Sequence, residues 1–167
     1  NEEYIELLKK GERAGHAIAT HNLGSHYYEG TFGLPKNQSM AIKLWTKSGN
    51  KLGNSSSCAN LGTYYGIELK DMNKALYYYE KGAILGNIAC RYRLGLLEKN
   101  CDLALIHFEI GARCGHKDSM GKIVEAFKIG NVSKDNFERI LRVHWDTVKA
   151  SESVNRTKGV LLNLSNG

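Results

Sequence analysis

The sequence predicts an all-α fold, a right-handed α-solenoid of about four helix-turn-helix repeats that is closed by a C-terminal capping helix. The first observation is a recurring pair of residues, Leu23-Gly24, Leu61-Gly62 and Leu94-Gly95, whose glycines are 38 and 33 residues apart. The second is an aromatic residue at the equivalent position in the second half of each repeat: Trp45, Tyr79 and Phe108. Periods of this size are typical of stacked supersecondary units, not of one closed core.

Both halves of each repeat carry a helical period. In the first repeat, Ala17, Leu23 and Tyr27 fall near one face of a helix. A glycine inside a helix costs about 1 kcal/mol relative to alanine, so a glycine that returns at one phase needs a packing reason. We expect that Gly24 and its equivalents admit the aromatic ring of the neighbouring helix.

The elements follow in order along one domain, residues 1–150. We expect a half repeat (1–16), three full repeats (17–54, 55–87 and 88–116), a degenerate repeat (117–132) and a capping helix (133–150). Ser133 is the predicted N-cap of the last helix. An apolar stripe on that helix includes Phe137, Ile140, Leu141, His144, Trp145 and Val148. Residues 151–167, with scattered Asn, Ser and Thr, are expected to form a poorly ordered C-terminal tail.

The repeats resemble the Sel-1-like repeat family, a relative of the tetratricopeptide repeats, over about residues 7–131. The resemblance implies a non-catalytic scaffold or adaptor that binds a partner protein or peptide on its concave surface. In tetratricopeptide-type stacks the first helix of each pair lines that surface. First-helix positions outside the Leu-Gly framework are then the candidate partner-binding residues: His21, Ser25, Tyr28, Thr63, Tyr92 and Leu96.

The sequence offers no catalytic constellation. His107, Cys114 and His116 lie near one another in the chain, but their spacing does not match a zinc site. The motifs G-x-S-x-G, H-E-x-x-H and G-x-x-x-x-G-K-[ST] are absent. We therefore expect no enzyme, no catalytic residue, no metal, no cofactor and no small-molecule substrate. The apolar runs are also far shorter than a membrane span.

Two other functions stay open at this stage. Lys plus Arg number 23 against 17 Asp plus Glu, a net charge of +6, and helical repeats of similar period bind single-stranded RNA. Such proteins carry polar residues at one fixed position of each repeat, and here that pattern breaks at Leu96, so nucleic acid is the less favoured partner. The chain could also be a structural spacer beside a further catalytic domain.

Localisation signals conflict. Some bacterial relatives of the family pair two cysteines within each repeat, whereas Cys58 has no partner in its own repeat. Four unpatterned cysteines favour a reducing compartment, so a cytoplasmic or other intracellular location is expected. Five N-glycosylation sequons, at Asn37, Asn54, Asn131, Asn155 and Asn163, keep the secretory pathway as the alternative. Asn and Ser also co-occur because both favour caps and turns.

Overall fold

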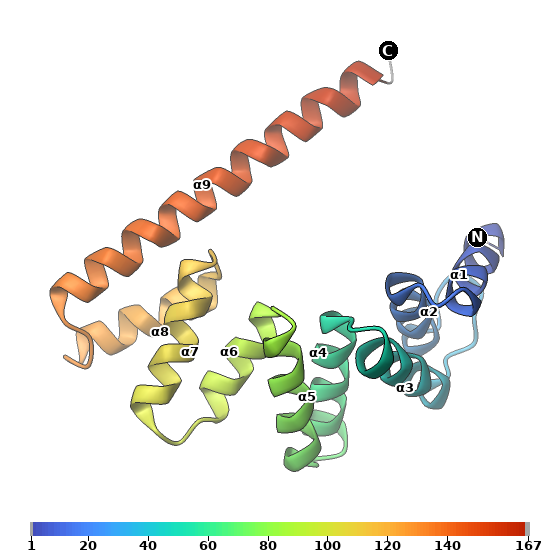
Figure 1. Ribbon diagram of the computed structural model, residues 1–167, viewed down its shortest axis with the longest axis horizontal. Helices are drawn as coiled ribbons and strands as arrows, with labels where there is room; N and C mark the ends of the chain where they lie inside the picture. Colours follow the sequence, from blue (N-terminus) through green and yellow to red (C-terminus); the bar gives the residue numbers. More distant parts are fainter. Residues whose placement is uncertain (1, 166–167) are drawn as a thin grey trace. The chain divides into compact units, whose positions relative to one another are not determined.

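The computed structural model describes residues 2–165, with side chains through residue 154, and these residues form helices without any strand (Figure 1). The helices are α1 (Glu2–Arg13), α2 (Ala17–Glu29), α3 (Gln38–Thr46), α4 (Ser55–Thr63), α5 (Met72–Ile84), α6 (Ile88–Leu97), α7 (Cys101–Arg113), α8 (Lys117–Lys128) and α9 (Lys134–Ser165). Two π-helical turns, η1 (Lys47–Lys51) and η2 (Tyr64–Glu68), continue α3 and α4. The predicted all-α repeat fold is confirmed.

The chain divides into two compact units, one ending at Leu94 and one beginning at Gly95. In the first unit, α1 packs on α2, α2 on α3, and α4 on α5. One core cluster joins the half repeat to the first full repeat and consists of Ile5, Leu8, Leu23 and Leu44. Ile5 and Leu8 are three residues apart on α1, so one apolar face of that helix is buried.

The Leu-Gly glycines lie against aromatic rings, as predicted. A Cβ added at Gly24 would lie 2.8 Å from Cδ1 of Trp45, and one at Gly62 would lie 2.5 Å from Cδ1 of Tyr79. At Gly95 the ring of Phe108 would be 2.6 Å away. Real Cβ atoms essentially never approach a heavy atom that closely. Each glycine is therefore required because a ring occupies the place where any other side chain would begin.

Two thiols fill the joint between the second and third repeats. Cys58 and Cys90 are fully buried, and a Cβ at Gly82 would collide with the Sγ of Cys90. Burial raises the pKa of Cys58, and burial together with Cys58 raises the pKa of Cys90 to about 12. Both thiols therefore stay protonated and pack as small apolar groups. All four cysteines are free, and Cys101 and Cys114 are exposed.

In the second unit, α9 packs against α7 and α8. Ile140 and His144 are buried, and His144 Nδ1 donates to the carbonyl oxygen of Ala112 at 2.7 Å. The rings of Phe127 and Phe137 stack with centroids 4.3 Å apart. A helix that covers the last repeat in this way buries an apolar face that would otherwise be exposed to solvent.

The predicted start of this helix is correct, whereas its predicted end is not. Ser133 accepts the Asn136 amide N–H at 3.3 Å as the N-cap. The helix continues to Ser165 and does not end near residue 150, because residues 151–165 contain no proline and a single glycine does not break a helix. Residues 166–167, and the side chains beyond residue 154, lie outside the described part of the tail. Trp145 was expected in the buried stripe, but 53% of it is exposed.

Candidate functional site

The candidate site is a cleft between the first helices of two adjacent repeats, which we call the α2–α4 cleft. It has a volume of about 190 Å³. Its lining comprises Ser25, Tyr28, Glu29, Trp45, Asn60, Thr63 and Tyr64. Three of the six residues that the sequence analysis selected therefore lie around one hollow, although 35 residues of chain separate Tyr28 from Thr63.

Trp45 is the rigid floor of this cleft. Its side chain is 3% exposed, its ring fits against Gly24, and its Nε1 donates to the His21 carbonyl oxygen at 3.3 Å. The Tyr28 ring packs on the indole, with centroids 5.1 Å apart and planes tilted by 39°. The aromatic surface is held in one orientation because each ring is fixed by a neighbour on another helix.

A polar bridge fixes the rim. The Tyr28 hydroxyl donates to the Glu68 carboxylate, which also accepts from Gln38 Nε2 at 3.2 Å. The hydrogen bond to Glu68, with the added burial and negative charge, raises the pKa of Tyr28 to about 12. Tyr28 therefore remains a neutral phenol at physiological pH. The bridge joins α2, α3 and η2, and thus two successive repeats.

The η2 turn brings Glu68 to this position. The hydrophobic period of the sequence predicts ordinary helices here and does not indicate that Glu68 or Gln38 lies near Tyr28. Each π-helical turn admits an i→i+5 hydrogen bond and widens the helix, and such turns are frequent at functional sites. A change from α-helical to π-helical hydrogen bonds does not alter the hydrophobic period. The sequence therefore gave no signal for these turns.

The other three predicted residues lie outside the cleft. His21 is half-buried and its Nδ1 lies 2.9 Å from Oγ of Ser57, so its ring joins α2 to α4. Tyr92 lies on α6 and is half-buried. Leu96 is on the same helix but belongs to the second unit, and 44% of it is exposed. Partner binding by all six residues stays a prediction.

One of the histidines that lie near Cys114 in the sequence has a structural role. His116 is the N-cap of α8, because its Nδ1 accepts the Ser119 amide N–H at 3.2 Å. Within the part of the chain that the structure describes, no group of three or more His, Cys, Asp and Glu side chains is arranged to hold a metal ion. None of the described helices is both long enough and apolar enough to span a membrane.

The repeat itself identifies the family. The model of the Sel1 repeat matches residues 17–51, 55–87 and 85–116, which together make up more than half of the chain. The chain belongs to the Sel1 repeat family. Proteins of this family generally act as scaffolds for protein–protein interaction and are typically not catalytic, and the predicted family assignment is confirmed.

Solved structures with the same fold include other Sel1 proteins. A Sel1 repeat protein from Oxalobacter formigenes superposes with a TM-score of 0.74 at 21% identity, over 85% of this chain and 62% of that one. The SLR-fold protein c5321, a protective antigen of uropathogenic Escherichia coli, gives 0.67 at 23% identity, over 87% of this chain. This chain spans only 36% of the length of c5321. The immunity protein Pa5087 of Pseudomonas aeruginosa gives 0.51 at 18% identity, over 86% of this chain and 73% of that one.

Proposed function

We propose that this Sel1 repeat chain is a non-catalytic adaptor that holds an extended segment of a partner protein along its first helices, with the α2–α4 cleft as the central contact. The observation that carries the proposal is the position of Ser25, Tyr28 and Thr63 around one hollow floored by Trp45. Buried aromatic anchors of this kind carry much of the energy in protein interfaces, and tyrosine is enriched among them.

The size of the cleft supports a protein ligand. Small-molecule sites occupy about 300–1,000 Å³, whereas this cleft measures about 190 Å³. It has room for one large side chain of a segment that runs across it. The Glu29 carboxylate and the faces of Tyr28, Trp45 and Tyr64 favour a basic side chain at this position, through charge pairing and cation–π contact.

The test is capture of partners from the native cell with the wild-type chain and three arginine variants. Ser25→Arg and Thr63→Arg place a long cation in the cleft, and Ser56→Arg adds the same charge to an exposed position near the start of α4. Partners identified by mass spectrometry should be lost with both cleft variants and retained with Ser56→Arg, while circular dichroism shows that all three are folded. Retention of every partner by the folded cleft variants would exclude the cleft.

We further propose that the chain works inside the cell. Two sequon asparagines use their side chains as helix caps, since Asn37 accepts from the Met40 amide N–H and Asn54 from that of Ser57. This conformational role accounts for Asn at both positions without a glycan. Treatment of the protein from its native cell with an endoglycosidase should leave its mobility on a gel unchanged, and a shift would place it in the secretory pathway.

A further inference from the structure

A second and larger hollow lies between α1 and α3, over α2, and we call it the α1–α3 groove. Its volume is about 660 Å³. Leu23 and Tyr27 of α2, with Met40 and Leu44 of α3, supply its apolar surface. Both α1 and α3 pack against α2, so the groove is a furrow between two helices with a third helix as its floor. None of its residues belongs to the α2–α4 cleft.

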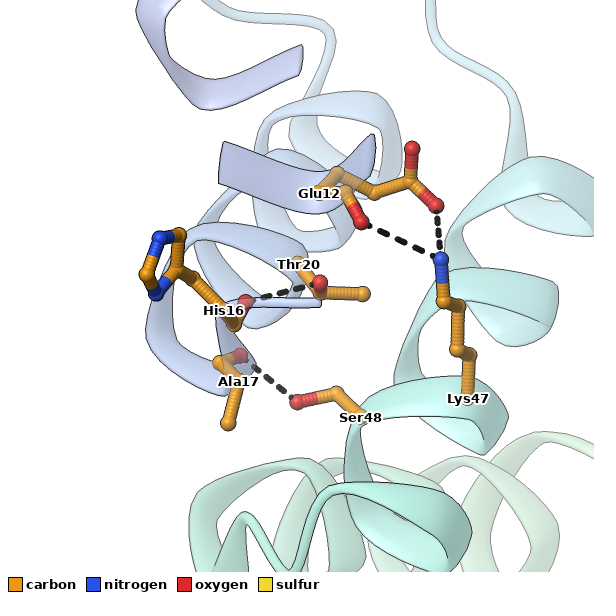
Figure 2. Close-up of polar contacts among 6 residues, drawn as sticks. All are labelled: Glu12, His16, Ala17, Thr20, Lys47 and Ser48. Atoms are coloured by element: carbon orange, nitrogen blue, oxygen red, sulfur yellow. Dashed lines mark hydrogen bonds and ion pairs between the residues drawn. The ribbon is translucent and has the colours of Figure 1, made fainter. Parts of the chain in front are cut away.

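Basic side chains surround this apolar floor. The lining contains five cations, Lys9, Arg13, Lys43, Lys47 and Lys51, and a single carboxylate, Glu12. Lys47 Nζ lies 2.5 Å from Oε1 of Glu12 and 3.2 Å from the Glu12 carbonyl oxygen (Figure 2). This pair, together with the Ser48 hydroxyl that donates to the Ala17 carbonyl oxygen at 2.8 Å, holds η1 against α1 and α2.

The other cations of the groove differ in whether a carboxylate of the chain already pairs with them. Lys9 and Arg13 share the exposed carboxylate of Glu6, at 3.6 and 2.9 Å. Among the described residues no carboxylate pairs with Lys43 or Lys51, and both are exposed. Lys43, Lys47 and Lys51 follow one another at intervals of four residues, a spacing at which like charges disfavour a helix. An acidic ligand would offset that repulsion.

We propose that the α1–α3 groove docks an acidic amphipathic helix of a partner protein. The apolar floor calls for Leu-like side chains on one face of the ligand, and the cations on the walls call for Asp or Glu beside them. The groove follows α3 and η1 from Met40 to Lys51, which at about 1.5 Å per residue is roughly 16 Å, or three turns of a docked helix.

The lining favours a protein helix over nucleic acid. A phosphate backbone would run past the Glu12 carboxylate, and the aliphatic floor offers only Tyr27 as a surface on which a base could stack. An acidic helix can place its carboxylates beside Lys43 and Lys51 and leave Glu12 in its existing pair with Lys47. This inference does not depend on the α2–α4 cleft, which differs in both position and charge.

The test measures binding to the full chain by fluorescence anisotropy with a labelled synthetic helix of about 15 residues, near the minimum length for a stable helix. The probe carries Leu at i, i+3, i+4 and i+7, Glu beside them and Ala elsewhere. A second probe replaces every Glu with Lys, and a third is a single-stranded RNA of similar length. The acidic probe should bind alone among the three, and its affinity should fall as NaCl rises from about 0.05 to about 0.5 M because salt screens the charges.

Variants locate the site. Lys43→Glu with Lys51→Glu removes two cations that the fold does not use, and should weaken binding of the acidic probe by about tenfold or more. The matched control is Lys99→Glu with Lys117→Glu, two exposed lysines of the second unit with the same change in net charge. Neither this control nor the cleft variant Thr63→Arg changes a residue that lines the groove, so each should bind within about twofold of wild type.

Each other outcome overturns the proposal. Equal binding of the acidic and basic probes would show that charge does not select the ligand, and preferential binding of RNA would assign the basic groove to nucleic acid. Undiminished binding by a folded Lys43→Glu/Lys51→Glu variant, or equal loss with the Lys99→Glu/Lys117→Glu control, would place the interaction elsewhere. Absence of binding by all three probes would exclude a docking function for the groove.

Discussion

The full repeats and the degenerate repeat use the same residue, a glycine inside the first helix, in opposite ways. Gly24, Gly62 and Gly95 each lie against an aromatic ring, whereas a Cβ at Gly121 of α8 would meet nothing within 4 Å. In the repeats the glycine is required by a neighbour, and in the terminal repeat it is only tolerated. Gly121 lies five residues after the N-cap His116, whereas Gly24 and Gly62 lie eight residues after theirs. A glycine inside a first helix therefore marks a joint between helices only at the phase where the following helix supplies a ring.

The largest effect is expected from removal of one of these rings. Trp45→Ala should lower the free energy of unfolding by about 3–5 kcal/mol, because it leaves a cavity beside Gly24 and removes the floor of the cleft. Urea unfolding followed by circular dichroism measures the change. Gly24→Ala should be less harmful in the Trp45→Ala background than in the wild type, since the colliding ring is gone. Equal effects in the two backgrounds would mean that the glycine and the ring are not coupled.

A methyl group added on the glycine side should have the next largest effect. Gly62→Ala places a carbon 2.5 Å from the Tyr79 ring, and we expect a loss of about 1–3 kcal/mol from overpacking despite the better helix propensity of alanine. The same urea titration tests this. A Gly62→Ala variant as stable as the wild type would show that Tyr79 can move aside at no cost.

The matched substitution in the terminal repeat should have the opposite sign. Gly121→Ala adds a methyl group in open space within α8, so it should raise the free energy of unfolding by about 0.5–1 kcal/mol through helix propensity alone. Thermal melts of Gly121→Ala and Gly62→Ala, measured together, compare the two regions directly. Destabilisation by both substitutions would remove the distinction between them.

The smallest expected effect is on how steeply the stability of the fold depends on pH, through His21 at the contact between the first and second repeats. Burial lowers the pKa of His21 below its ordinary value of 6.5, and its ring contacts Ser57 of the next repeat. As the pH falls below about 6.5, the unfolded chain takes up a proton at this position more readily than the folded chain, so stability decreases. His21→Gln should flatten the dependence of stability on pH between about 7 and 5. An unchanged slope would mean that His21 does not contribute to it.

The repeat architecture could be predicted because one physical constraint recurs three times. The Leu-Gly pairs and Trp45, Tyr79 and Phe108 share a phase in the sequence, and the structure places each ring on its glycine. Ser25 and Thr63 each follow the Leu of their repeat by two residues, and both line the α2–α4 cleft together with Tyr28. Their binding of a partner stays a prediction. These predictions needed only local period and repetition.

Other features depend on contacts that repetition does not encode. The bridge from Tyr28 to Glu68 requires the η2 turn, which changes the hydrogen-bond spacing without a change of hydrophobic pattern. The α1–α3 groove combines side chains from three helices, and Lys9 and Lys51 are far apart in the sequence and in different repeats. Trp145 matches the apolar stripe of α9, yet 53% of it is exposed, although His144 and Thr147 on either side of it both contact α7.

The layer of thiols between the second and third repeats has a kinetic consequence. Cys101 and Cys114 are exposed, so an alkylating reagent reaches them in the folded chain, whereas Cys58 and Cys90 are fully enclosed and held as protonated thiols. Because thiolates are the reactive form, the enclosed pair can react only after the repeats separate and water enters. Cys101 and Cys114 are therefore modified at once, whereas the rate at which Cys58 and Cys90 are modified reports how often the stacked repeats open. The native cysteines serve as the probe for this opening.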